Sequence, residues 1–178
     1  MVSQLEAPLF NSHQPLPYSI EGIVQVFTCA HRSFFTNVIA QALRIAGQGT
    51  PVLVVQFLKG GIGQGPHQPV QLGQHLDWLR CDMPECIASA DVEEATMAAL
   101  HQLWHYTKSV VTQGKYALVV LDELSLAIEF NLIPEAEVLE LLEHRPRSVD
   151  VILTGPAMPR SILDRADQIT ELRYHPRS

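Results

Sequence analysis

The chain has 178 residues, of which 47% are hydrophobic and 17% charged, a size that is typical of one globular domain with a sizeable core. Its 19 acidic and 12 basic residues give a net charge of −7, and so small and dispersed a basic set argues against a nucleic-acid binder. No apolar run reaches the roughly 20 residues of a membrane span, and the first residues lack a secretory-signal pattern. The 3 scattered cysteines favour the reducing cytoplasm.

Residues 1–20 carry three prolines among polar residues, which predicts an irregular N-terminal arm. We expect residues 21–178 to form a single domain in which short apolar runs alternate with helical stripes. The predicted strands cover residues 22–28, 52–57, 76–81, 116–121, 149–154 and 168–172. The predicted helices cover a stripe over 38–46, the segment 91–112, two short helices after residue 123, and a last helix around 161–166.

Two of these helices carry start signals. Asp91 and Glu94 form an Asp-x-x-Glu pattern that predicts a capping box, and Pro134 falls in the first turn of the second short helix, where its missing N–H costs nothing. The alternation predicts βαβ units and a parallel sheet of about six strands with helices on both faces, a three-layer α/β/α fold. Ligands of such sheets bind beyond the carboxyl ends of the strands.

Several of those strand ends carry short motifs in a fixed order. They are Gly22-Ile-Val-Gln-Val-Phe-Thr28, Ala46-Gly-Gln-Gly49, Val54-Val-Gln-Phe-Leu-Lys-Gly60, Val119-Val-Leu-Asp-Glu-Leu124, Leu153-Thr-Gly155 and Ala166-Asp-Gln-Ile-Thr-Glu-Leu-Arg173. Together they resemble the P-loop ATP:corrinoid adenosyltransferases of cobalamin biosynthesis. The resemblance implies a RecA-like P-loop NTPase sheet and a homodimer. It also implies transfer of the adenosyl group of ATP to Co(I) of a corrinoid, with Mg²⁺ or Mn²⁺.

The phosphate-binding loop of that family, Gly-x-Gly-x-Gly-Lys-Thr-Thr, is rewritten in this chain. In register, Cys29, His31 and Ser33 replace the three glycines. Phe34 and Phe35 replace the lysine and the metal-binding threonine. Glycines let backbone N–H groups turn onto phosphates and a lysine neutralises their charge, whereas two phenyl rings do neither.

Some anion affinity is still expected in this loop, from Arg32, Thr36 and the helix N-terminus. Adjacent helical residues point about 100° apart, so we expect one of the two phenyl rings to pack inward or to fill the vacated nucleotide cleft, and the other to lie at the surface as a contact point. A second departure is Asp82-Met-Pro-Glu-Cys86, where the family has a Gly-Phe-Thr-Trp-like segment associated with the corrinoid.

The carboxylate pair Asp122-Glu123 after an apolar strand has a Walker B pattern, in which the first carboxylate holds Mg²⁺. The alternative, which we favour, is a pair stabilised by the dipole at the start of the next helix, or a relic inherited from the family. Lys59, Thr154 and Gly155 are further candidates for the cleft. For Lys59 and the glycines after it, a plain surface loop is the simpler interpretation.

The histidines do not predict a metal site. His101 and His105 share a helix face four residues apart, but a third ligand is missing nearby, so we interpret them as a polar face and expect no bound metal.

Three functions follow. The first is a degenerate homologue without ATP, metal or corrinoid, kept as a binding, regulatory or assembly protein that associates with itself or with another protein. The second is a divergent but active adenosyltransferase that uses ATP, Mg²⁺ or Mn²⁺, and a corrinoid. The third is a pure interaction module that uses Phe34, Phe35 and the proline-containing arm.

Overall fold

The computed structural model describes residues 21–173, so the arm predicted over residues 1–20 lies outside the described residues. The strands are β1 (Val24–Cys29), β2 (Val52–Gly60), β3 (Val70–Leu72), β4 (Leu76–Cys81), β5 (Leu118–Asp122), β6 (Asp150–Thr154) and β7 (Gln168–Leu172). The helices are α1 (Thr36–Gly47), α2 (Glu94–Thr112), α3 (Leu124–Glu129), α4 (Glu135–His144) and α5 (Arg160–Leu163). All six predicted strands are present, with small shifts at their ends.

The strands form one sheet in the order β3-β4-β2-β5-β6-β1-β7, which has 7 strands where about six were predicted. Every neighbouring pair is parallel except β3 with β4, which is antiparallel. The additional strand is β3, a three-residue edge strand whose residues are all exposed. It has neither the length nor the buried side chains that make a strand visible in a hydrophobic pattern.

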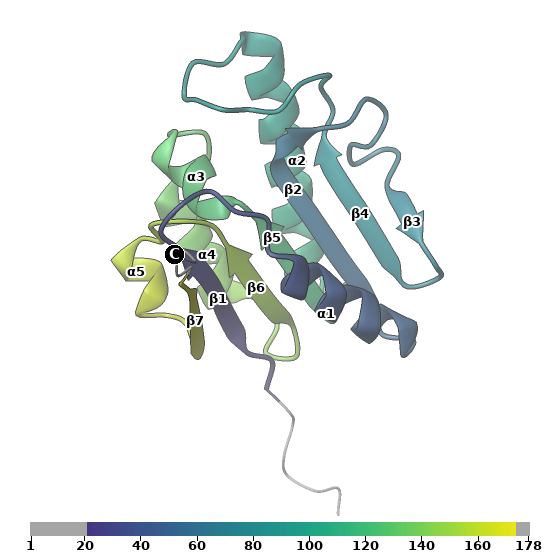
Figure 1. Cartoon of the computed structure of the whole chain (residues 1–178). Helices are drawn as coiled ribbons and strands as arrows, with labels where there is room; N and C mark the ends of the chain where they lie inside the picture. Colours follow the sequence, from purple (N-terminus) through teal and green to yellow (C-terminus); the bar gives the residue numbers. More distant parts are fainter. Residues whose placement is uncertain (1–20, 174–178) are drawn as a thin grey trace, which may run out of the picture.

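Helices cover both faces of the sheet, which confirms the three-layer α/β/α prediction (Figure 1). Residues alternate along β2: Val52 and Val54 pack with α1 on one face, whereas Leu53 and Val55 belong to the core on the other face, which α2, α3 and α4 cover. The strand is therefore buried on both sides, as its continuous apolar run predicts. None of the helices described within residues 21–173 has the length and apolarity to cross a membrane.

Two details of the predicted helix starts are wrong. Helix α2 is capped by Glu93, without a side-chain hydrogen bond, so Asp91 and Glu94 form no capping box. The helix begins three residues later than predicted, which places Asp91 too far from the first free N–H groups. Pro134 is the N-cap of α4 and thus directly precedes its first turn.

Candidate functional site

The carboxyl ends of β1, β2, β5 and β6 meet at one edge of the sheet and carry most of the predicted site residues (Figure 1). The parallel register places Gln56 opposite Asp122, and Phe27 opposite Thr154. Side chains from four separate chain segments therefore meet around the carboxylates that end β5.

Asp122 is the centre of this arrangement, with its residue only 2% exposed. Its Oδ1 accepts a hydrogen bond from Thr154 Oγ1 at 2.8 Å. Its Oδ2 accepts one from Gln56 Nε2 at 2.8 Å and lies 3.5 Å from Lys59 Nζ. Both carboxylate oxygens are therefore engaged by side chains of the chain itself.

Gln56 is a site residue that the sequence reasoning missed. Its side chain is buried, and its Oε1 accepts hydrogen bonds from Trp78 Nε1 at 2.9 Å and Arg80 Nε at 3.0 Å, while its Nε2 donates to Asp122. A buried amide with every polar atom bonded fixes the orientation of its neighbours. The available signal was a single polar residue within the apolar run of β2.

Glu123 forms a bidentate ion pair with Arg32 of the β1–α1 loop. Arg32 Nε lies 2.5 Å from Oε1, and its second terminal nitrogen (Nη2) donates to Oε2 at 3.0 Å. The first terminal nitrogen donates to the carbonyl oxygen of Ile87 at 3.1 Å. The hydrogen bond with Glu123, before any other cause, raises the pKa of the Arg32 guanidinium above its ordinary value. Arg32 thereby connects the loops after β1, β4 and β5.

The backbone at Glu123 adopts a left-handed conformation with φ 57°. For a residue with a Cβ atom this costs roughly 1–2 kcal/mol. The conformation is compensated locally, because Thr154 Oγ1 accepts a hydrogen bond from the Glu123 N–H at 3.0 Å. The chain therefore uses the β6 hydroxyl twice, as a donor to Asp122 and as an acceptor from Glu123.

Gly155, directly after Thr154, is required by its conformation and its surroundings. Its φ is +138°, and a Cβ atom there would lie 2.1 Å from Ser125 Oγ. The β6 end can therefore approach the start of α3 only with glycine at this position.

The two phenylalanines of the β1–α1 loop differ as predicted. Phe35 is 1% exposed, packs in the core between α1 and the sheet, and is the N-cap of α1. Phe34 is 49% exposed, and Lys59 Nζ lies 4.2 Å from its ring centroid. One ring is therefore part of the core and the other covers a cation at the candidate site.

The remaining loop residues do not reach the carboxylates. The thiol of Cys29 donates to the carbonyl oxygen of His31. Among the residues that the structure describes, no hydrogen bond joins the side chains of His31, Ser33 or Thr36 to Asp122 or Glu123.

Asp122 and Glu123 lie directly before α3, and their predicted interaction with the dipole of that helix stays a prediction. Glu123 is the N-cap of α3, and no side-chain cap hydrogen bond is made. The carboxylates are instead held by Arg32, Lys59, Gln56 and Thr154. Two cations lie against two carboxylates, so this part of the site is close to neutral.

Within the described residues no group of three or more His, Cys, Asp or Glu side chains could hold a metal ion.

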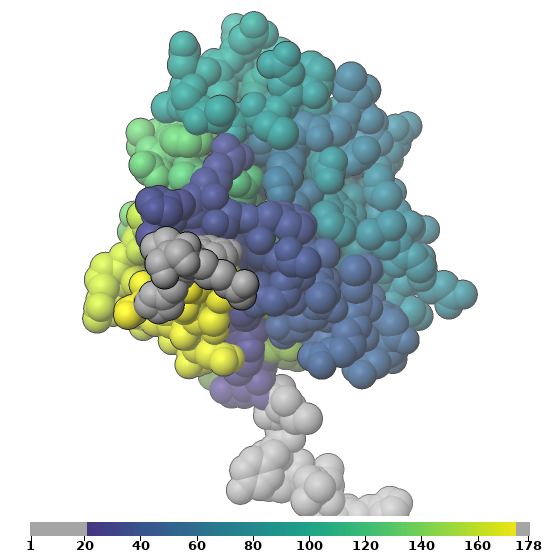
Figure 2. All heavy atoms as spheres, in the orientation of Figure 1, coloured from purple at the N-terminus to yellow at the C-terminus, as the bar shows by residue number. Residues whose placement is uncertain are grey.

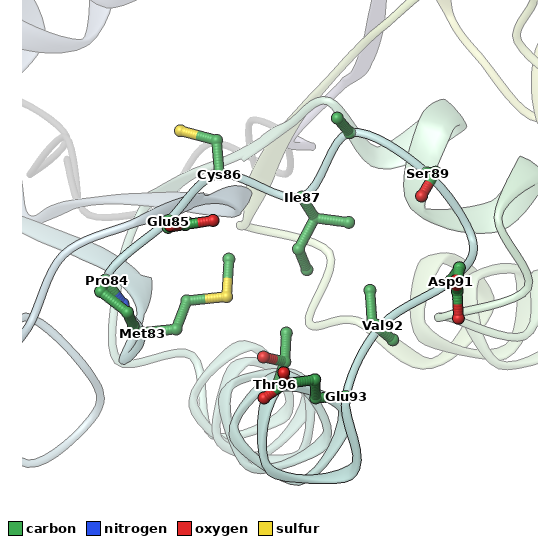
Figure 3. Close-up of a pocket in the computed structure, with 11 residues that line it drawn as sticks. Met83, Pro84, Glu85, Cys86, Ile87, Ser89, Asp91, Val92, Glu93 and Thr96 are labelled. Carbon is green, nitrogen blue, oxygen red and sulfur yellow. The ribbon is translucent and has the colours of Figure 1, made fainter.

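A pocket of about 470 Å³ lies beside this site, in the segment between β4 and α2 (Figure 3). Its lining residues are Met83, Pro84, Glu85, Cys86, Ile87, Ala88, Ser89, Asp91, Val92, Glu93 and Thr96. This is the segment in which the sequence departs from the family a second time. The pocket is linked to the carboxylates through Arg32, which bonds Glu123 and also donates to the carbonyl oxygen of Ile87.

Comparison with known proteins agrees with the sequence motifs. Residues 20–177 match the model of the family described as ATP:corrinoid adenosyltransferase BtuR/CobO/CobP. The corrinoid adenosyltransferase of Escherichia coli K12 is 31% identical over 152 residues, which cover 85% of this chain and 76% of that protein. The corrinoid adenosyltransferase CobA of Salmonella typhimurium is 33% identical over 152 residues, with the same coverage of 85% and 76%.

A more distant relative extends the match. A corrinoid adenosyltransferase of a Sinorhizobium species is 26% identical over 170 residues, covering 88% of this chain and 75% of the relative. The family model spans nearly the whole chain, and the two enterobacterial relatives exceed 30% identity over most of it. The chain belongs to the ATP:corrinoid adenosyltransferase family.

Proposed function

We propose that this protein is a non-catalytic member of the family, which serves as a binding, regulatory or assembly protein. One observation carries the proposal: the two carboxylates that end β5 are bonded by Arg32 and Lys59 of the same chain. A Walker B carboxylate must be free to hold Mg²⁺. Here the carboxylates and the nearby cations satisfy one another.

The β1–α1 loop supports the same proposal. Residues 29–36 contain no glycine, so their backbone cannot easily turn its N–H groups onto a polyphosphate. Phe35 is committed to the core, and Phe34 offers an apolar ring where a P-loop has its lysine. The residues present therefore do not fit Mg²⁺-bound ATP.

A second candidate is a divergent but active adenosyltransferase. The observation that favours it is that Asp122 and Thr154 still meet at the carboxyl edge of the sheet, in a chain whose relatives are named corrinoid adenosyltransferases. In that case the protein would use ATP with Mg²⁺ or Mn²⁺ and a corrinoid.

The first candidate, the non-catalytic family member, needs no ATP, metal or corrinoid. Instead, it needs self-association or a protein partner, for which exposed Phe34 is the candidate contact.

Calorimetric titration with ATP distinguishes the two candidates. We expect a dissociation constant weaker than about 1 mM, or less than ~4 kcal/mol of standard binding free energy, with and without Mg²⁺ and corrinoid. The matched comparison is a restored loop that carries Cys29→Gly, His31→Gly, Ser33→Gly, Phe34→Lys and Phe35→Thr. A folded restored-loop variant should bind ATP more tightly than the natural chain. A micromolar dissociation constant for the natural chain would overturn the proposal and favour the active enzyme.

A further inference from the structure

A second groove lies at the far edge of the sheet and is connected to the site described above by the hydrogen bonds of Trp78 and Arg80 to Gln56. It is lined by Gln64, Val70, Leu72, Trp78 and Arg80, has a volume of about 240 Å³, and is called the β3–β4 groove below. In Figure 2 the β3–β4 region, in blue to teal, forms the right-hand margin of the molecule. Val70 and Leu72 leave 36% and 39% of their surface exposed there.

The Arg80 guanidinium, the charged group that lines this groove, has no carboxylate partner among the described residues. No carboxylate of residues 21–173 lies within salt-bridge distance of Arg80. Arg80 is nevertheless held in place, because its Nε donates to Gln56 Oε1, which also accepts from Trp78 Nε1. A guanidinium binds carboxylates strongly when its orientation is fixed in advance. The groove therefore suits an occupant with one carboxylate flanked by apolar side chains.

The chain itself contains such a segment. Glu6 is the only charged side chain in residues 1–20, and Leu5, Leu9 and Phe10 lie close to it in sequence. The segment thus supplies one carboxylate and several large apolar groups, which match one guanidinium and the apolar side chains of β3 and β4.

The position at which the segment joins the domain permits the contact. It precedes β1, whose beginning lies at the same edge of the sheet as the β3–β4 turn (Figure 1). Four strand spacings separate β1 from β4, or about 19 Å at ~4.8 Å each. The chain from residue 6 to residue 21 spans up to roughly 50 Å when extended, which exceeds this separation.

We propose that residues 1–20 bind intramolecularly in the β3–β4 groove, with the Glu6 carboxylate on the Arg80 guanidinium. A tether of this length supplies an effective concentration of order 1 mM, so a contact with a dissociation constant near ~0.1 mM in the free state would be about 90% formed. The docked segment would also hold Trp78 and Arg80 against Gln56, and through it the orientation of Asp122. The inference does not depend on whether the protein is catalytic.

Paramagnetic broadening in the full chain tests the contact. Exposed Cys86 is changed to Ser, Ser3 is changed to Cys and carries a nitroxide, and the buried Cys29 and Cys81 are left in place. We expect strong broadening of the Trp78 indole N–H resonance. The Trp104 indole, buried on the opposite face of the sheet, is the internal reference and should be broadened less. Equal broadening of both indoles would overturn the proposal.

Charge reversal tests the ion pair. Glu6→Lys should abolish the selective broadening of Trp78, whereas the control Gln14→Lys, which adds a cation to the same segment, should preserve it. Arg80→Glu should also abolish it, and the combination of Glu6→Arg with Arg80→Glu should restore it. If Arg80→Glu unfolds the domain, Glu6→Lys and Phe10→Ser test the contact without it, because both substitutions lie outside residues 21–173. Each of the two should abolish the selective broadening of Trp78. Persistence of the broadening in Glu6→Lys would overturn the proposal.

A mixed sample separates this inference from contact between two copies. Isotope-labelled chains without nitroxide are combined with unlabelled chains that carry it. Broadening of Trp78 in this mixture would show docking from a second copy and overturn the intramolecular contact. The expected result is no broadening in the mixture.

Discussion

At the scale of single residues, the site consists of buried polar side chains that depend on one another. No buried side-chain nitrogen or oxygen among the described residues lacks a hydrogen-bond partner. Gln56 connects Trp78 and Arg80 to Asp122, and Asp122 connects Gln56 to Thr154. When one member of such a network is changed, its partners lose their bonds in a place that water does not reach.

Asp122→Asn should destabilise the domain by about 3 kcal/mol, since an amide cannot accept from Gln56 and Lys59 while it also accepts from Thr154. This is more than the ~1 kcal/mol that a lost helix-cap interaction would cost. Urea denaturation measures the difference, with exposed Asp91→Asn as the control. A loss below ~1 kcal/mol would contradict a structural role for the Asp122 network.

Phe35→Ala should reduce the free energy of unfolding by ~3–5 kcal/mol, because the ring is buried in the core between α1 and the sheet. Phe34→Ala should reduce it by less than ~1 kcal/mol, which corresponds to the cation–π contact with Lys59. The second change should instead weaken any association that uses the exposed ring. Denaturant melts and light scattering on the two variants measure these effects, and equal stability losses would refute the assignment.

At the scale of elements, α2 and α4 are joined by one carboxylate. Trp104 Nε1 donates to Glu137 Oε2 at 2.7 Å, and Lys108 Nζ lies 2.5 Å from the same oxygen. These contacts, with Lys108 first and Trp104 second, lower the pKa of the Glu137 carboxyl below its ordinary value. The contact joins the two helices across the surface of the domain, next to the core that they share.

A folded-state pKa below the unfolded value means that Glu137 stabilises the domain above roughly pH 4.3, the ordinary glutamate value. This contribution is lost as the pH falls through the lowered pKa. Melting temperatures measured between pH 7 and pH 3 should therefore fall less steeply for Glu137→Gln than for the natural chain. The control is Glu140→Gln, an exposed residue of the same helix, which should follow the natural chain. Identical slopes for all three proteins would contradict the role of this contact.

At the scale of the whole molecule, the sheet order decides which residues meet. Arg32 and Glu123 are 91 positions apart, and Lys59 and Asp122 are 63 apart. They meet because β2, β5, β6 and β1 lie side by side in parallel and end at the same edge. The near-neutral site, and with it the expected weak binding of ATP, is therefore a property of the complete fold.

The sequence by itself determined the architecture. Runs such as Val52–Leu58 and the α1 stripe with Val38, Ile39 and Ala42 predicted strands and helices correctly, since hydrophobic periodicity is a local property of the chain. The opposite burial of Phe34 and Phe35 was also predicted, but both residues precede α1, so the helical period used for that prediction is not its physical reason. The motifs at the strand ends were sufficient to indicate the family that the comparisons confirm.

Only the tertiary structure decided how the site is neutralised. Three features depend on side-chain distances that no local sequence pattern encodes. Arg32 bonds Glu123, Gln56 orients Asp122, and Asp91 does not cap α2. The edge strand β3 was also invisible, because exposed residues leave no periodic apolar signal. Burial patterns repeat along the chain, whereas hydrogen bonds and ion pairs form between groups that the crossovers bring together from distant segments.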